Sequence, residues 1–186
     1  MKANSDESPG RSGGTIQSLE APGKRPGTYG LLMRSARPGR LRVGSAGQLA
    51  LKPGLYLYLG SAFGPGGLGA RLGRHATRSK SKHWHIDYLR PRTSLICAFF
   101  STSSERLEHL WASRILALPE AEIPLTRFGA SDCRCPSHLF FFPACDSRKR
   151  EIGLALEASG GGHVGVLEAN SLRGLARRGS RRRHPI

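Results

Sequence analysis

The stretch PGLYLYLGSAFGPGGLGARLGRH, residues 53–75, determines how the chain folds. Residues 55–59 alternate leucine with tyrosine between glycine and proline, which is typical of a short β-strand. The glycine-rich residues 60–67 predict a tight loop, because glycine adopts backbone angles that other residues avoid. Leu68, Leu72 and Ala76 then recur at helical spacing. Residues 68–77 are therefore expected to form a helix with one apolar face.

Apolar runs on either side of this stretch predict further strands. Residues 28–33 and 95–100 are short and apolar enough to be buried strands. Segments 40–43 and 48–51 flank a Gly-Ser-Ala-Gly turn and are expected to form a hairpin that extends the same sheet. The order of elements predicts an α+β fold, with a small, mainly antiparallel sheet, flanking helices and an inserted hairpin.

A second helix is predicted after the strand at 95–100. Thr102 and Glu105 have the spacing of a capping box, in which both side chains bond to the backbone of a helix N-terminus. The expected inward stripe consists of Leu107, Leu110, Trp111 and Ile115. Glu108 lies at the edge of this stripe, where a carboxylate is unfavourable unless it meets a cation or a metal ion.

The two ends of the chain differ from the middle in composition. Residues 1–26 are rich in Ser, Gly, Pro and charge without apolar periodicity, so we expect a disordered tail. Residues 27–143 carry the apolar patterns and are expected to form the folded domain. Residues 144–186 combine a weak apolar pattern with a run of arginines, which predicts a basic, flexible C-terminal extension.

The chain is strongly basic, with 29 Lys and Arg residues against 13 Asp and Glu residues and a formal net charge of +16. Residues 27–143 alone carry 16 basic and 6 acidic residues. A surplus of this size favours a polyanionic partner, and we expect nucleic acid, with DNA favoured. Whether the chain also has a protein partner stays open.

Composition also bears on location. No apolar run approaches the roughly 18 residues that cross a bilayer, so no membrane association is expected. The opening MKANSDESPGRSGG is polar, unlike a secretory signal, and an intracellular, cytoplasmic protein is expected. Four cysteines in a chain of this length favour free thiols or a metal site over a disulfide framework.

Two tyrosine-glycine motifs stand on neighbouring predicted strands, Gly27-Thr28-Tyr29 and Tyr58-Leu59-Gly60. They are followed by Arg71 and His75 on the next helix and by Glu108 on a later one. This arrangement resembles the GIY-YIG nuclease family. Two features depart from that pattern. Thr28 stands where an aliphatic residue is usual, and the inserted hairpin lengthens the connection between the tyrosines.

Residues 27–143 also look like a narrower group, an uncharacterised GIY-YIG-like domain that some archaea carry alone or fused to endonuclease III. The likeness rests on four segments, which are GTYGLLMR, PGLYLYLGSAFGPGGLGARLGRH, HWHIDYL and FGASDCRCPSHLFFF.

The resemblance implies a metal-dependent endonuclease that hydrolyses phosphodiester bonds in DNA, with repair or processing as its setting. Glu108 would hold one Mg²⁺ or Mn²⁺ ion, and Arg71 would clamp a phosphate oxygen. His75 would bind phosphate or relay a proton. Tyr29 or Tyr58 would help to deprotonate the attacking water, which requires a cation to lower a tyrosine pKa from about 10.

Other polar residues near the second motif are expected to contact the substrate: Arg74, Lys80, Lys82 and His85. Residues 83–89, HWHIDYL, alternate polar and apolar side chains, so the polar ones would point to one side if the segment is extended. We expect them to line or support the active groove. The alternative for Arg71 and His75 is a solvated basic face of the helix.

Cys133, Cys135 and His138 supply at most three of the ligands that a zinc ion needs. His83, His85 or Cys145 would have to complete the site, and a turn in which Asp132 caps the backbone is the favoured alternative. Three functions therefore stay open: a nuclease, a non-catalytic nucleic-acid-binding module that uses the same groove, and a zinc-stabilised interaction domain.

Overall fold

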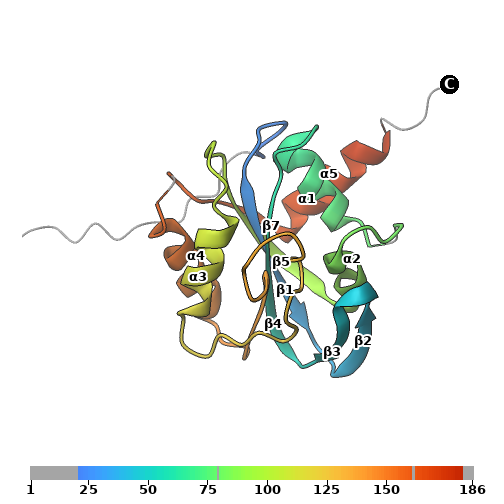
Figure 1. The fold of residues 1–186 in the computed structure, drawn as a ribbon. Helices are drawn as coiled ribbons and strands as arrows, with labels where there is room; N and C mark the ends of the chain where they lie inside the picture. The colour runs from blue at the N-terminus through green and yellow to red at the C-terminus, as the bar shows by residue number, and fades with distance from the viewer. Residues whose placement is uncertain (1–20, 79, 161, 182–186) are drawn as a thin grey trace, which may run out of the picture.

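The computed structural model describes residues 21–78, 80–160 and 162–181, and its central element is a five-stranded antiparallel sheet (Figure 1). The strands are β1 (Thr28–Ser35), β2 (Gly39–Val43), β3 (Gly47–Leu51), β4 (Gly54–Ser61), β5 (Ser94–Ser101), β6 (Leu139–Phe142) and β7 (Gly165–Glu168). The helices are α1 (Gly67–Ala76), α2 (His85–Leu89), α3 (Glu108–Leu116), α4 (Arg148–Glu157) and α5 (Ala169–Arg181). The predicted α+β fold with an antiparallel sheet is confirmed.

The sheet has the strand order β6-β4-β1-β5-β7 and is covered on both faces. In Figure 1, α1, α2 and α5 lie on one side of it and α3 and α4 on the other. Neighbouring residues of β1 pack into different hydrophobic clusters. Leu31 belongs to the cluster under α1, α2 and α5, and Leu32 belongs to the cluster under α3 and α4. Successive strand residues point to opposite faces, so a strand buried on both sides reads as a continuous apolar run.

The hairpin of β2 and β3 is present but forms a separate two-stranded sheet, which corrects the expectation that it extends the main sheet. The reason is that β1 lies between β4 and β5, and β4 lies between β1 and β6, so neither strand has a free edge. The hairpin packs through Val43 and Leu49 against the core under α2 instead.

Helix α3 begins later than predicted, at Glu108, and the capping box of Thr102 and Glu105 is not formed. Serine side chains organise this segment, since the hydroxyl of Ser103 accepts the amide of Glu105 at 3.2 Å. The predicted stripe is correct for Leu107, Trp111 and Ile115, which are buried. It is wrong for Leu110, which is 39% exposed, because Ala112 takes the inward position.

Residues 83–89 do not form an extended segment, because α2 occupies most of them. The carboxylate of Asp87 accepts the backbone amides of His83 and Trp84 at 2.9 and 3.1 Å. Capping of this kind satisfies amides that lack a partner at a helix start and so stabilises the helix over an extended chain.

The segment expected to be a flexible extension, 144–186, contains α4, β7 and α5 as far as residue 181. Strand β7 pairs with β5, and Leu172 of α5 is buried against the sheet. Helix α5 also approaches α1 closely, since a Cβ atom on Gly73 would lie 3.2 Å from the carbonyl oxygen of Leu175. The core thus extends well beyond residue 143, and residues 182–186 lie outside the described part.

Most of the predicted N-terminal tail, residues 1–20, also lies outside the described residues. The remainder contributes to the fold. The carbonyls of Gly23 and Arg25 accept the amides of Gly69 and Leu68 at 2.7 and 2.9 Å, which satisfies two amides in the first turn of α1. Within the described ranges, the helices are too short or too polar to traverse a bilayer.

Candidate active site

A cleft of about 370 Å³ opens at the end of the sheet where β1 begins and β4 ends. Its lining falls into two groups. We call Tyr29, Tyr58, Arg71 and Trp84 the sheet wall, and Glu108, His109, Cys133 and His138 the loop wall. A second cavity of about 280 Å³ beside the hairpin contains no acidic, histidine or cysteine side chain in its lining. The cleft is therefore the candidate site.

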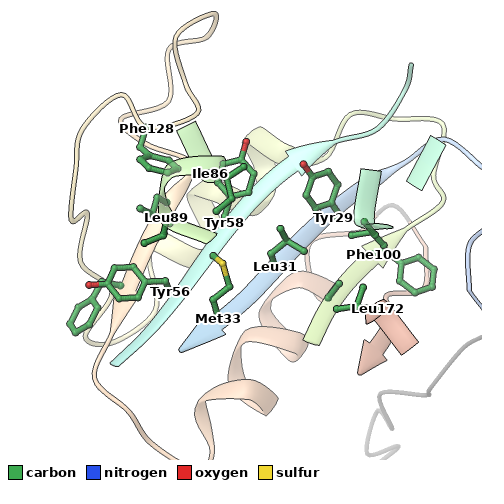
Figure 2. Packing of buried hydrophobic residues seen from close by; sticks show 14 of the residues in the cluster. Tyr29, Leu31, Met33, Tyr56, Tyr58, Ile86, Leu89, Phe100, Phe128 and Leu172 are labelled. Carbon is green, nitrogen blue, oxygen red and sulfur yellow. The ribbon is translucent and has the colours of Figure 1, made fainter. Parts of the chain in front are cut away.

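The register of β1 and β4 brings the two tyrosines together. Tyr29 lies opposite Gly60, and Tyr58 lies opposite Leu31, so the rings are diagonal neighbours with centroids 6.4 Å apart. Figure 2 shows them on the same face of the sheet, with Phe128 beside Tyr58. Gly60 is required here, because a Cβ atom at that position would lie 2.6 Å from the Tyr29 hydroxyl.

Tyr29 forms a buried pair with His75 of α1. The Tyr29 hydroxyl and His75 Nε2 are 2.9 Å apart, and His75 Nδ1 has no hydrogen-bond partner among the described residues. Burial, with the nearby Lys80 charge, holds the pKa of His75 well below 6.5. The imidazole is therefore neutral at physiological pH, and one of its nitrogens accepts while the other carries the proton.

Burial raises the pKa of both tyrosines. The pKa of Tyr29 lies well above 10, through burial and then the neighbouring Tyr58. Burial raises the pKa of Tyr58 to about 12. The charge of Arg71 lowers both values but is outweighed by the loss of hydration. Without a bound cation both tyrosine side chains are therefore protonated, and their hydroxyls act as hydrogen-bonding groups.

Arg71 projects from α1 into the cleft with its guanidinium stacked on the Trp84 ring, 4.1 Å from the centroid. No carboxylate of the described residues lies within ion-pair distance of it. Contact with Trp84 on one side and a hydrogen bond with the Tyr29 side chain hold the guanidinium at the cleft, where its other N–H donors can bind an anion.

Of the four predicted substrate contacts, the structure brings only His85 to the cleft lining, where its Nδ1 accepts the amide of Gly129 at 2.9 Å. Arg74 and Lys80 bind Asp87 instead, at 3.0 and 2.8 Å. Lys82 lies over the Tyr88 ring, outside the lining.

Asp87 is the buried anchor for those two cations. Burial alone would raise its pKa, but Lys80 and the amides of His83 and Trp84 outweigh it and lower the pKa to about 2. Asp87 therefore ties α2 to α1 beneath the sheet wall.

Glu108 begins α3 on the opposite side of the cleft and is 6% exposed. Its Oε2 is buried without a partner, and Oε1 lies 3.9 Å from the mostly exposed Arg106. The amide of Leu107, just before it, donates to the Thr28 hydroxyl at 3.0 Å. Thr28, which departs from the aliphatic residue of the resembled motif, thus joins β1 to the start of α3.

Four side chains of the loop wall and its surroundings are grouped closely enough to hold a metal ion: His109, Cys133, Cys135 and His138. Their potential ligand atoms all lie within 4.8 Å of one another. Sequence reasoning found three of the four but missed His109, which no spacing links to the cysteines. His83, His85 and Cys145, the expected fourth ligands, are not members of the group.

The fold and this cleft define an α+β domain whose sheet end carries paired tyrosines, an arginine and a partly unsatisfied glutamate. The chain belongs to the family described as domain of unknown function DUF123, whose model matches residues 28–160. No curated protein and no solved structure gives a significant match. The family is uncharacterised, and the likeness to GIY-YIG nucleases rests on the motifs alone.

Proposed function

We propose that this protein is a metal-dependent endonuclease that hydrolyses phosphodiester bonds in DNA. The observation that carries the proposal is the buried, unpartnered Oε2 of Glu108 in the same cleft as Arg71, which has no carboxylate partner among the described residues. A carboxylate would repel a phosphate in a purely binding groove unless a cation lies between them.

Glu108 fits a divalent metal. A buried carboxylate oxygen without a hydrogen bond is costly unless a cation compensates it, and Mg²⁺ typically takes one or two carboxylates and keeps several waters. A bound Mg²⁺ or Mn²⁺ would neutralise charge on the phosphate and the leaving oxygen. Arg106, 3.9 Å away and mostly exposed, is too distant for a strong ion pair in its place.

Arg71 binds the scissile phosphate on the other side of the cleft. Its planar guanidinium can donate two parallel hydrogen bonds to phosphate oxygens, and stacking on Trp84 fixes its orientation beforehand. Pre-oriented donors stabilise the charge that develops as the phosphate is attacked.

The tyrosine pair positions the attacking water. Since burial keeps both hydroxyls protonated, they act through hydrogen bonds and not as free phenolates. The hydroxyl of Tyr29 is held in place by neutral His75, whose Nε2 lies 2.9 Å away. Tyr29 and Tyr58 are therefore assigned to hold and orient that water through their hydroxyl groups.

The basic character of the chain supports nucleic acid as the substrate class. One observation favours the alternative of a non-catalytic binding module. Burial raises the pKa of both tyrosines, and proton transfer through such groups is slow unless the substrate and metal lower them.

The test is incubation of the purified full chain with supercoiled, branched and single-stranded DNA, with Mg²⁺, with Mn²⁺ and with chelator. Cleavage of any of these that requires the divalent ion supports the nuclease. Tight, salt-sensitive binding without cleavage under every condition would replace the proposal with the binding module.

A further inference from the structure

The group of His109, Cys133, Cys135 and His138 has a different chemistry from the Glu108 site. It offers two thiols and two imidazoles, whereas Mg²⁺ and Mn²⁺ prefer oxygen ligands. Two cysteines and two histidines form a common ligand set of structural zinc sites, which are tetrahedral and closed to solvent ligands. The ligand chemistry of this group therefore indicates a metal site separate from the proposed Mg²⁺ site at Glu108.

The distances agree with a zinc site. His109 Nδ1 lies 3.2 Å from Cys135 Sγ, and His138 Nε2 lies 3.6 Å from Cys133 Sγ. Zinc bonds of about 2.1 Å to nitrogen and 2.3 Å to sulfur place tetrahedral ligand atoms about 3.4–3.8 Å apart. All four ligand atoms lie within 4.8 Å, so small side-chain movements complete the tetrahedron.

The backbone around the cysteines is already held in place. The guanidinium of Arg127 donates to the carbonyls of Cys133 and Ser131 at 2.6 and 2.9 Å. The amide of His138 donates to the carbonyl of Phe128 at 2.8 Å. These bonds fold the loop before β6 into one compact turn, so that metal binding orders few further groups.

The ligands come from separate parts of the fold. His109 is the second residue of α3, and His138 immediately precedes β6. Cys133 and Cys135 lie between them in the loop, and neither is in a disulfide. An ion bound by all four would fasten the loop to the start of α3, next to Glu108.

We propose that His109, Cys133, Cys135 and His138 bind one Zn²⁺ ion in a structural site that fastens the loop before β6 to α3. Binding releases the two thiol protons to solvent, and the two imidazoles coordinate as neutral rings through Nδ1 of His109 and Nε2 of His138. The charges of Zn²⁺ and two thiolates cancel, so the site leaves the net charge of the cleft unchanged.

The experiment measures zinc in the purified full chain by elemental analysis, followed by titration of the metal-free protein with Co²⁺ alone. We expect one zinc per chain and a cobalt spectrum with tetrahedral d–d bands and thiolate charge-transfer bands. Cys133→Ser and His109→Ala should each weaken zinc binding by more than about 100-fold, since losing an outer-shell partner already costs about 10–100-fold. His109→Cys should restore binding.

Matched controls come from residues outside the group. Cys145→Ser removes an exposed thiol, and His163→Ala removes an exposed imidazole. Both variants should keep one zinc per chain. His109 is itself exposed, so His109→Ala should keep its fold, which circular dichroism verifies. Metal-free wild type that binds no zinc, or zinc that survives Cys133→Ser and His109→Ala, would overturn the proposal. Because the experiment measures metal content, it tests the zinc site independently of DNA cleavage.

Discussion

The two walls of the cleft are built in different ways. The sheet wall stands on β1, β4 and α1, with Tyr29 and His75 almost completely buried and Asp87 fixing α2 beneath them. The loop wall consists of the start of α3 and the loop before β6. Its members Glu108 and His138 are buried, whereas His109 is exposed and Cys133 is half-buried. Packing in the core therefore holds the tyrosines of the sheet wall, while hydrogen bonds and the proposed zinc hold the more exposed part of the loop wall.

The two walls therefore differ in what holds their reacting groups in place. Of the groups that would touch phosphate and water on the sheet wall, the two tyrosines are buried and Arg71 packs on Trp84. Glu108, the corresponding group on the loop wall, lies between Leu107, whose amide donates to Thr28, and His109 of the proposed zinc site. We expect substitutions under the sheet wall to affect folding most, and substitutions under the loop wall to affect metal binding and the geometry of α3.

The largest effect on stability is expected from Asp87→Asn. The substitution removes the charge that compensates Lys80, whose side chain is only 8% exposed. Removing one partner of a buried ion pair costs about 3–5 kcal/mol, which denaturant unfolding will measure. Glu122→Gln is the control, since its pair with Lys52 is half-exposed and worth less than about 1 kcal/mol. Equal small losses in both variants would show that the network does not support the wall.

The Asp87 carboxyl also makes the free energy of unfolding depend on pH. Its pKa is about 2 in the fold against an ordinary 3.8, so its stabilisation is complete above about pH 4 and is lost as the pH falls toward 2. The loss amounts to about 2 kcal/mol. Wild-type unfolding should show this decline and Asp87→Asn should lack it, whereas parallel curves would contradict the assignment.

The next largest effect is expected on the rate of DNA cleavage, from substitution of Arg71 in the sheet wall. Arg71→Ala should lower the single-turnover cleavage rate about 10²–10³-fold, the usual cost of losing one pre-oriented donor to a developing anion. DNA affinity should fall less than about tenfold. Lys82→Ala removes the same charge outside the cleft lining and should leave the rate nearly unchanged. If both variants lose only affinity, Arg71 is a groove contact and not part of the reaction.

A smaller effect is expected where the two walls meet. Thr28→Val keeps the side-chain shape but leaves the buried amide of Leu107 without its acceptor, which costs about 1–3 kcal/mol of unfolding free energy. Because this bond holds the start of α3, the apparent affinity for Mg²⁺ should weaken as well. Thr28→Ser keeps the hydroxyl and should behave like wild type. An unchanged Mg²⁺ affinity in Thr28→Val would mean that β1 does not position Glu108.

Most of the sheet wall could be predicted, together with His75 behind it, whereas Trp84 was not. Tyr29 and Tyr58 lie in short apolar strands, and Arg71 and His75 lie one turn apart on a helix with a clear apolar face. Periodicity predicts the strands and the helix that carry these residues, and the resemblance to the GIY-YIG family predicts that they form one site.

The loop wall and the C-terminal segment depend on contacts between distant residues. Nothing near His109 in the sequence indicates that it meets Cys135, 26 positions away. Leu172, Leu175 and Ala176 of α5 recur at helical spacing, a pattern that the prediction of a flexible extension did not use. The four-residue strand β7 is recognisable only through its pairing with β5.

The most direct test of the account is the single-turnover cleavage rate as a function of Mg²⁺ concentration, for wild type and for Glu108→Gln on the same DNA. The account predicts a saturable dependence in wild type and a rate at the metal-free background in the variant. DNA binding by Glu108→Gln should be equal or tighter, because a negative charge leaves the cleft. Equal Mg²⁺ curves for the two proteins would contradict the claim that Glu108 holds the metal of a nuclease.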